Sequence, residues 1–360
     1  MVVKKSMVFI IGMLIVFNIL SNNIELELEK KIKLKATKDI VLLSLSNFTM
    51  GKNGEFIFPD GRASNIKVFD ANGKFMYLLG RKGHGPGEFI TPYACYGNGK
   101  SIWISDIRAL KISQYDYTNN RYKYKRDCLR LSSLCTDLFV KNNIVYIAGY
   151  VQGEKQTNYY MYSKKCNVEA KFNVSKYLIK SKLKYGVDTP SKTDHYSSYD
   201  MSGYFDILDD NIYFVWGADL RIIKFNLKNN SVNIFGKKTK NYIKPFVSKE
   251  LKIAYKQRDS LKVANTKKNV CFVGGIFVTD NLVGLVYRGI YQEKINGYPV
   301  FVQFYSTEGK YLNEIRLKEA VGNLFNKSFY YSPNKKKLYY LNIIENDDDD
   351  DYEILVYKLK

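Results

Sequence analysis

Short apolar runs with alternating polar positions recur along the chain, separated by turn-forming residues. Two segments align without a gap: residues 60–70 read DGRASNIKVFD and residues 106–116 read DIRALKISQYD, at a period of 46 residues. An apolar run precedes each of them, EFIF at residues 55–58 and SIWIS at residues 101–105. The pattern predicts a repeated unit of strand, loop, strand, tight turn and strand.

Looser copies of the unit begin at Asn142, Asp210, Asp280 and Lys336, which gives six units in all. The expected hairpin turns carry residues that tolerate positive φ, namely Asn72-Gly73, Asn119-Asn120, Asn229-Asn230 and Glu308-Gly309. A single antiparallel unit of this size cannot bury both of its faces. Radial closure solves that problem, so we expect an all-β fold, a six-bladed β-propeller of four-stranded antiparallel blades.

The sixth unit ends at Lys360 directly after its third strand, so that blade needs an outer strand from elsewhere. Residues 24–35, IELELEKKIKLK, alternate with period two and have no unit of their own. We expect this segment to pair as the outer strand of the last blade and close the ring. The alternative is a free amphipathic N-terminal arm.

Residues 1–23 have the layout of a signal peptide. Lys4 and Lys5 precede an uncharged apolar stretch at residues 7–20, which as a helix would span about 21 Å, less than the roughly 30 Å of a bilayer core. We therefore expect an exported protein, periplasmic or extracellular, with one propeller domain at residues 24–360. The cleavage site is poor, so an uncleaved membrane anchor remains the alternative.

The net charge is +21, carried by 46 Lys and 10 Arg spread over the chain. Base recognition favours clustered Arg, so no nucleic-acid partner is expected. Two His residues and five Cys residues at irregular spacing indicate neither a metal site nor a disulfide framework. We expect no metal and no cofactor.

Residues 66–89, IKVFDANGKFMYLLGRKGHGPGEF, resemble the NHL-type six-bladed β-propellers of the TolB-like superfamily. The resemblance is greatest to exported bacterial propeller proteins whose first full blade ends in a GxxGxGPGEF loop. It implies the propeller fold and says little about activity.

The glycine-rich loop itself has two interpretations. A phosphate-binding loop would have to open a helix after a parallel strand, whereas here prolines and a further strand follow. We therefore expect a structural loop that turns the chain from one blade to the next, with a contribution of His84 and Glu88 to a ligand site as the alternative. The residues concerned are Gly80, Gly83, Gly85, Pro86, Gly87 and Glu88.

Ligands of propellers commonly bind where two sets of loops converge on the axis: those between the second and third strands of each blade, and those that connect one blade to the next. The charged and aromatic residues expected there are Asp60, Arg62, Asp106, Arg108, Trp216, Asp219, Arg221 and Arg288. The recurring Asp-x-Arg could be a local ion pair that braces each loop, or part of a charged ring that binds an anionic or polyhydroxylated ligand.

Three segments interrupt the repeat. Residues 182–204, which include His195, read as a long polar loop that could act as a lid. Residues 245–263 predict a short amphipathic helix with Ser248 as its cap and with Leu251, Ala254, Tyr255 and Leu261 on the packed face. Residues 347–351 are five consecutive Asp, which indicate a solvated hairpin tip, or otherwise a weak Ca²⁺ site.

These observations favour a monomeric, non-catalytic binding or scaffold module. Its ligand would be an unknown small molecule, a glycan or a protein at the loop face. The alternative is a metal-dependent lactonase or lyase with its site in the central channel, whose ligands would come one from each blade. A third possibility, an RNA-binding NHL domain, is contradicted by the signal sequence.

Overall fold

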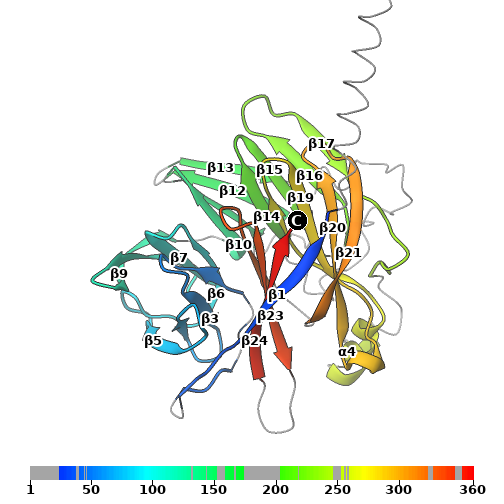
Figure 1. The fold of residues 1–360 in the computed structure, drawn as a ribbon. Helices are drawn as coiled ribbons and strands as arrows, with labels where there is room; N and C mark the ends of the chain where they lie inside the picture. The colour runs from blue at the N-terminus through cyan, green and yellow to red at the C-terminus, as the bar shows by residue number, and fades with distance from the viewer. Residues whose placement is uncertain are drawn as a thin grey trace, which may run out of the picture.

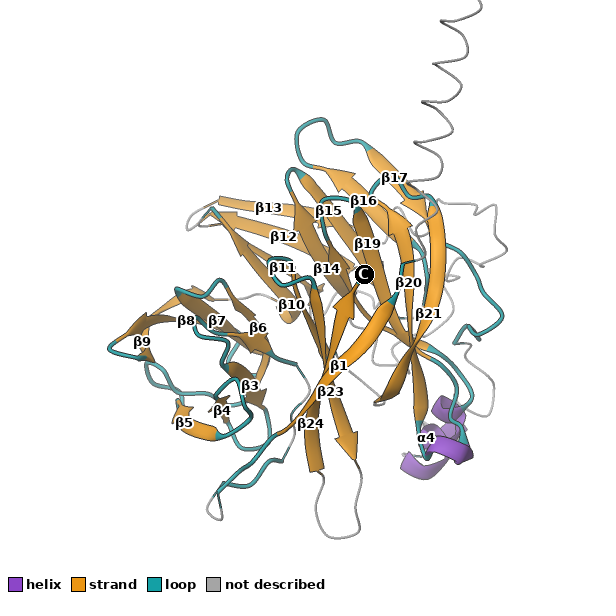
Figure 2. Cartoon of the chain, viewed as in Figure 1, coloured by secondary structure: helices purple, strands orange, loops and turns teal. Residues whose placement is uncertain are grey.

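The computed structural model describes residues 24–360 apart from 38–39, 44, 46, 131–132, 143, 152–158, 166–167, 174–202, 218, 246–252, 255–256, 258, 323–326 and 345–350. The described residues form six four-stranded antiparallel sheets, which are arranged as blades around a central axis (Figures 1 and 2). In each blade the strands follow one another from the inner edge to the outer edge, and we label them a to d. The expected all-β six-bladed propeller is confirmed.

Blades 1 to 3 use consecutive strands. Blade 1 contains β2 (Thr49–Met50), β3 (Phe56–Asp60), β4 (Asn65–Phe69) and β5 (Phe75–Leu79). Blade 2 contains β6 (Pro92–Gly97), β7 (Ser101–Asp106), β8 (Lys111–Thr118) and β9 (Arg121–Arg130). Blade 3 contains β10 (Ser133–Lys141), β11 (Ile144–Val151), β12 (Tyr159–Lys165) and β13 (Val168–Asn173).

Blades 4 and 5 continue in the same way. Blade 4 contains β14 (Gly203–Leu208), β15 (Asn211–Trp216), β16 (Ile222–Asn226) and β17 (Val232–Phe235). Blade 5 contains β18 (Phe272–Val278), β19 (Leu282–Arg288), β20 (Tyr298–Ser306) and β21 (Tyr311–Gly322), with the short helix η2 (Glu293–Ile295) between β19 and β20. The helix α4 (Ser260–Lys268) precedes this blade.

Blade 6 joins the two ends of the chain. Its strands are β22 (Phe329–Ser332), β23 (Lys337–Ile344), β24 (Asp351–Leu359) and, at the outer edge, β1 (Leu26–Lys33). β1 runs antiparallel to β24 from Leu26 opposite Leu359 to Lys33 opposite Glu353, with one irregularity between Leu28 and Lys30. The expected closure of the ring by the N-terminal strand is therefore confirmed, and the alternative of a free arm is wrong.

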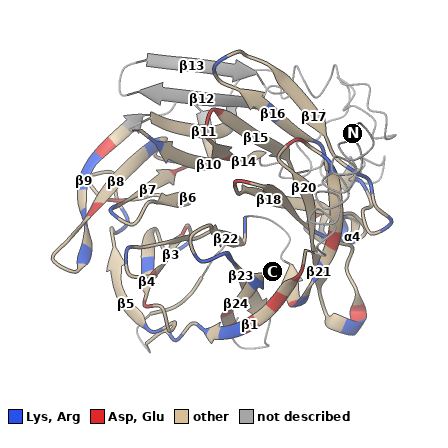
Figure 3. Ribbon diagram, turned by 45° about the horizontal axis from the view of Figure 1, so that its top comes forward, with Lys and Arg blue, Asp and Glu red and all other residues tan. Residues whose placement is uncertain are grey.

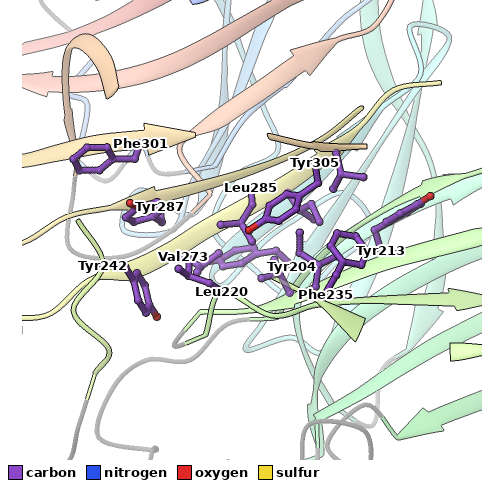
Figure 4. Close-up of a cluster of buried hydrophobic side chains, with 14 of the residues drawn as sticks. Tyr204, Tyr213, Leu220, Phe235, Tyr242, Val273, Leu285, Tyr287, Phe301 and Tyr305 are labelled. Atoms are coloured by element: carbon purple, nitrogen blue, oxygen red, sulfur yellow. The ribbon is translucent and has the colours of Figure 1, made fainter. Parts of the chain in front are cut away.

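The core lies between the blades. The buried apolar residues form six clusters, and each cluster joins two neighbouring blades. Figure 4 shows the cluster between blades 4 and 5, where Tyr287 stacks on Phe301 at a ring-centroid distance of 5.2 Å and Phe235 lies 5.4 Å from Tyr305. Each sheet thus buries its faces against the next sheet, which explains the many aromatic residues of the chain.

The turns between the c and d strands have the backbone that their residues favour. Asn119 and Asn120 have φ of 52° and 59°, as a two-residue hairpin of the primed type requires. Gly73 has φ of 81°, and a Cβ atom there would lie 2.3 Å from the carbonyl oxygen of Lys33, so only glycine fits. These expected turns are confirmed.

The predicted helix at residues 245–263 lies partly outside the described residues. Within that range Ile253 and Ala254 are helical, and Ala254, expected on the packed face, is buried. The helix α4 begins at Ser260, because the Asp259 carboxylate accepts the backbone N–H of Lys262 and caps it. Leu261, expected on the packed face, is 77% exposed. The helix α4 overlaps the predicted segment only at residues 260–263 and continues beyond it to Lys268. The proposed cap Ser248 lies outside the described residues.

Several other predictions fall partly outside the described residues. They concern the signal segment 1–23, most of the loop 182–204 with His195, and residues 347–350. Tyr204 belongs to β14, and Asp351 begins β24, where it pairs with Lys33 at 3.0 Å. The described residues contain no helix with the length and hydropathy needed for a bilayer crossing.

Closure of the ring predicts a position-dependent effect along β1. Ile32 is buried in the cluster between blades 6 and 1, whereas Lys30 on the same strand is exposed. We expect Ile32→Asp to lower the free energy of unfolding by about 3 kcal/mol or more, because it buries an unpaired charge. Lys30→Asp should stay within about 0.5 kcal/mol. Urea unfolding measures both, and equal effects of the two changes would contradict the pairing.

Candidate functional site

The inner strands of all six blades surround a central cavity with a volume of about 650 Å³. One lining residue from each inner strand shows this: Thr49, Tyr96, Phe139, Asp206, Phe277 and Tyr330. The lining also includes residues 279–281 in one a–b turn and Pro333 and Lys336 in another. The cavity therefore reaches the face of the propeller that carries the a–b turns. Figure 3 views the molecule more nearly along the axis of the ring than Figure 1 and shows the inner strands around the centre.

Two ionisable side chains, Asp206 and Lys327, line the cavity, and the buried Asp137 pairs with Lys327. The Lys327 ammonium donates to both carboxylate oxygens of Asp137, each at 3.2 Å. Asp206 lines the cavity with Lys327, and its charge interacts with both Lys327 and Asp137. We refer to Asp137, Asp206 and Lys327 as the channel triad. Its members come from β10, β14 and the loop before β22.

The two aspartates also connect neighbouring blades. Asp137 accepts the backbone N–H of Phe205 on β14 at 3.1 Å, and Asp206 accepts the N–H of Val278 on β18 at 2.8 Å. Each carboxylate additionally accepts the N–H of the residue that follows it. Both carboxylates thus hold an inner strand to the inner strand of the next blade.

Burial changes the acidity of the triad. It raises the pKa of Asp206 to about 6, with the Asp137 carboxylate adding to the increase and Lys327 and the backbone amides opposing it. Burial also raises the pKa of Asp137, although Lys327 lies against it. Asp206 therefore changes charge at about pH 6, where an ordinary aspartate is already ionised.

Aromatic rings form much of the cavity wall. Tyr96 packs on Phe139 with ring centroids 4.6 Å apart, and Phe48 lies 6.5 Å from Tyr330. Burial raises the pKa of Tyr96 and Tyr330, and the negative charge of Asp206 raises both further. The two phenols therefore stay protonated and can donate hydrogen bonds.

The predicted loop residues Asp60 and Asp106 brace loops, but not through arginine. Asp106 is fully buried and accepts four backbone N–H groups, those of Ile90, Thr91, Arg108 and Ala109. Asp60 accepts the N–H groups of Leu43 and Ala63 and forms a buried ion pair with Lys67. The side chains of Arg62 and Arg108 are exposed. The expected Asp–Arg ion pair is therefore wrong in blades 1 and 2, because backbone amides and Lys67 occupy the carboxylates.

Blade 4 does contain such an ion pair. The Arg221 guanidinium donates through Nε to Asp219 at 2.6 Å, and both side chains are buried. Trp216, at the end of β15, is also buried. These residues therefore lie inside the b–c region of the blade rather than on its surface.

Arg288 in blade 5 is buried as well. Its guanidinium lies 3.9 Å from the ring centre of Tyr298 and 4.5 Å from that of Phe272, and it donates to the carbonyl oxygens of Lys267, Val270 and Gly289. Burial lowers its pKa to about 10. The side chain fastens the end of α4 to the blade.

None of the eight residues expected at the b–c loops lines the cavity described above. They lie at the opposite ends of the strands, because in an antiparallel meander the b–c and a–b connections emerge on opposite faces. Their role in ligand binding stays a prediction.

The glycine-rich loop connects β5 to β6, and therefore blade 1 to blade 2. The Glu88 carboxylate accepts the N–H of Gly85 and the Nε of Arg81, each at 2.8 Å, and these contacts lower the pKa of Glu88. Gly87 has φ of 73° and packs against Tyr124. His84 and Pro86 are exposed, and neither lines the central cavity.

In the described part of the chain, no group of three or more His, Cys, Asp or Glu side chains lies close enough together to hold a metal ion. The channel triad combines two carboxylates with an ammonium. Such a set suits hydrogen bonding and charge pairing with an organic ligand.

Comparison with known proteins identifies the family. The model of the DUF5128 family, described as a 6-bladed β-propeller, matches residues 19–287. The chain belongs to this family. No curated protein matches the sequence.

Two solved structures have the same fold. A DUF4221-family protein from Bacteroides vulgatus gives a TM-score of 0.59 at 12% identity, covering 94% of this chain and 99% of its own. A protein from Bacteroides fragilis described as exported gives 0.54 at 14% identity, covering 93% and 95%. At these identities the likeness concerns the fold alone.

Sequence reasoning missed the channel triad of this DUF5128 propeller. A usable signal exists for two members, since Asp137 and Asp206 each interrupt an apolar inner strand, in SLCTDLFVK and GYFDIL. A carboxylate in such a position must find partners or a ligand. Lys327 precedes β22 and carries no comparable local signal.

The loop geometry predicts that Asp106 and Arg108 have unequal effects on stability. Asp106→Ala removes the acceptor of four backbone amides and should lower the free energy of unfolding by about 3 kcal/mol. Arg108→Ala removes an exposed side chain and should change it by less than about 0.5 kcal/mol. Chemical denaturation of the two variants beside the wild type decides this. A large effect of Arg108→Ala would restore the ion-pair interpretation.

Proposed function

We propose that this protein is an exported, non-catalytic binding module whose small-molecule ligand occupies the central channel. The observation that carries the proposal is the cavity of about 650 Å³ at the axis, to which every blade contributes. Cavities of roughly 300–1,000 Å³ are typical of small-molecule sites. The site would be reached from the face with the a–b turns.

The chemistry of the lining supports binding. Aromatic rings supply apolar contact area, while Asp206, Lys327 and the two phenols supply a few polar groups. Such a composition orients a ligand that has an apolar body and a polar end. A metal-dependent lactonase or lyase, the alternative from the sequence, has no observation in its favour among the described residues.

Export rests on residues 1–23 and on the B. fragilis relative described as exported. The apolar stretch at residues 7–20 would act as the recognised part of a signal peptide. A protein in the periplasm or outside the cell is separated from cellular nucleic acid, which agrees with the expectation of a different partner.

Binding in the channel predicts where substitutions will act. Leu208 lines the cavity, so Leu208→Trp should fill part of it and weaken the binding of small aromatic probes such as benzyl alcohol and phenylacetate by about tenfold or more. The double change Arg62→Ala and Arg108→Ala lies at the other face and should leave binding within about twofold. Ligand-observed NMR on both variants measures this. The reverse result would move the site to the b–c loops.

Export predicts the fate of a reporter fused after Asn23. The fusion should leave the cytoplasm, and Ile11→Asp combined with Leu14→Asp should retain it, because the recognised segment must be apolar. Cell fractionation with an activity assay of the reporter measures both. Cytoplasmic retention of the unmodified fusion would contradict export.

A further inference from the structure

We propose that the central channel binds an organic cation, with the Asp206 carboxylate as its counter-ion and the rings of Tyr96 and Tyr330 beside it. This inference rests on the proposed binding function and names its ligand class. It depends on the charge balance of the channel triad, on the aromatic wall and on the size of the cavity.

The charge balance leaves one carboxylate without an ammonium of its own. Lys327 is engaged with both oxygens of Asp137, whereas the hydrogen bonds of Asp206 come from the backbone N–H groups of Ile207 and Val278. When all three groups are ionised, the triad carries one positive and two negative charges. The remaining negative charge is centred on Asp206, which lines the cavity.

The surroundings of Asp206 suit a cation. Tyr96 and Tyr330 line the same cavity, both are partly exposed, and the charge of Asp206 acts on both phenols. An aromatic ring attracts a cation to its face, and a neighbouring carboxylate adds to the attraction. Phe48 and Phe139, which pack on these two tyrosines, extend the wall.

The cavity is larger than one cationic group requires. Its volume of about 650 Å³ leaves room for an aromatic or aliphatic body attached to the charged end. The mouth also carries cations of the protein, but Lys360 is paired with Glu27. Lys336 lies in the turn at the rim, away from the triad. An anionic ligand beside Lys327 would also lie close to the Asp206 carboxylate, which lines the same cavity.

The test compares three probes that share one ring and differ in charge: benzyltrimethylammonium, benzyl alcohol and phenylacetate. Isothermal titration at pH 8 should show the cation binding at least about tenfold more tightly than the other two, because Asp206 is then ionised. Asp206→Asn should abolish this preference and leave the binding of benzyl alcohol within about twofold. Asp280→Asn, a matched change of an exposed carboxylate at the cavity mouth, should preserve the preference.

A second pair of variants tests the same inference if Asp206→Asn does not fold. Tyr330→Leu should weaken cation binding by about fivefold or more, and Tyr330→Phe, which keeps the ring, should restore it. Melting curves of each variant show that it is folded.

The pH dependence gives a further readout. Benzyltrimethylammonium keeps its charge, so its affinity should rise as the pH increases through about 6 and Asp206 ionises. The groups that face Asp206 are Lys327, Asp137, Tyr96 and Tyr330. Burial also raises the pKa of the nearby Cys95 thiol, which stays neutral over this range. The rise should be absent in Asp206→Asn.

The outcomes separate the two proposals. Binding of none of the three probes would overturn the channel as a small-molecule site. Binding of all three with equal affinity, tighter binding of phenylacetate, or a cation preference that survives Asp206→Asn would overturn the cation inference and leave the binding function in place.

Discussion

Packing of one blade against the next is the constraint on which the rest of the structure depends. Each four-stranded sheet has two apolar faces, and the six buried clusters each join a pair of adjacent blades. A row of such sheets would leave an apolar face open at each end. The ring removes both open faces, and the pairing of β1 with β24 holds it shut. The central cavity follows from this arrangement, since the inner strands cannot meet at the axis.

Polar residues reinforce the ring at two levels. At the loop face, Asp60 and Asp106 hold b–c loops to the segments that enter the inner strands. Nearer the axis, Asp137 and Asp206 hold the inner strands of blades 3, 4 and 5 to one another. Of these four carboxylates only Asp206 lines the central cavity, so this carboxylate could serve both the fold and the site. Ligand binding at Asp206 would then act directly on the contact between blades 4 and 5.

The architecture could be predicted from the sequence because its signals are local. Alternating residues, Asn and Gly at tight turns, and the gapless repeat at residues 60–70 and 106–116 each report on a few neighbouring positions. The site could not be predicted in this way. Asp137 lies 68 positions from Phe205 and 190 positions from Lys327 in the sequence, so no linear motif brings the triad together.

The Asp-x-Arg repeat was misleading. Its aspartates accept backbone N–H groups of the loops, which is a structural role that recurs with the loop. Its arginines in blades 1 and 2 are exposed to solvent. The end of α4 at Lys268 was not predicted, although its start depends on the local capping carboxylate of Asp259.

The closure of the ring also sets an order of events during folding. Lys33 and Asp351 meet across 318 positions, whereas the strands of blades 1 to 5 pair with immediate neighbours in the chain. Blades built from consecutive strands can form as the chain emerges, but blade 6 has to wait for the last strand. The entropic cost of joining strands so far apart in the sequence is modest, because loop closure costs only about 0.6 kcal/mol for each doubling of the loop length. Its kinetic consequence is larger: β1 and the apolar faces of blades 1 and 5 that blade 6 covers stay open to other chains until β24 arrives. A chain that crosses a membrane unfolded would meet this interval on the far side, which makes the last blade the point where folding and aggregation compete.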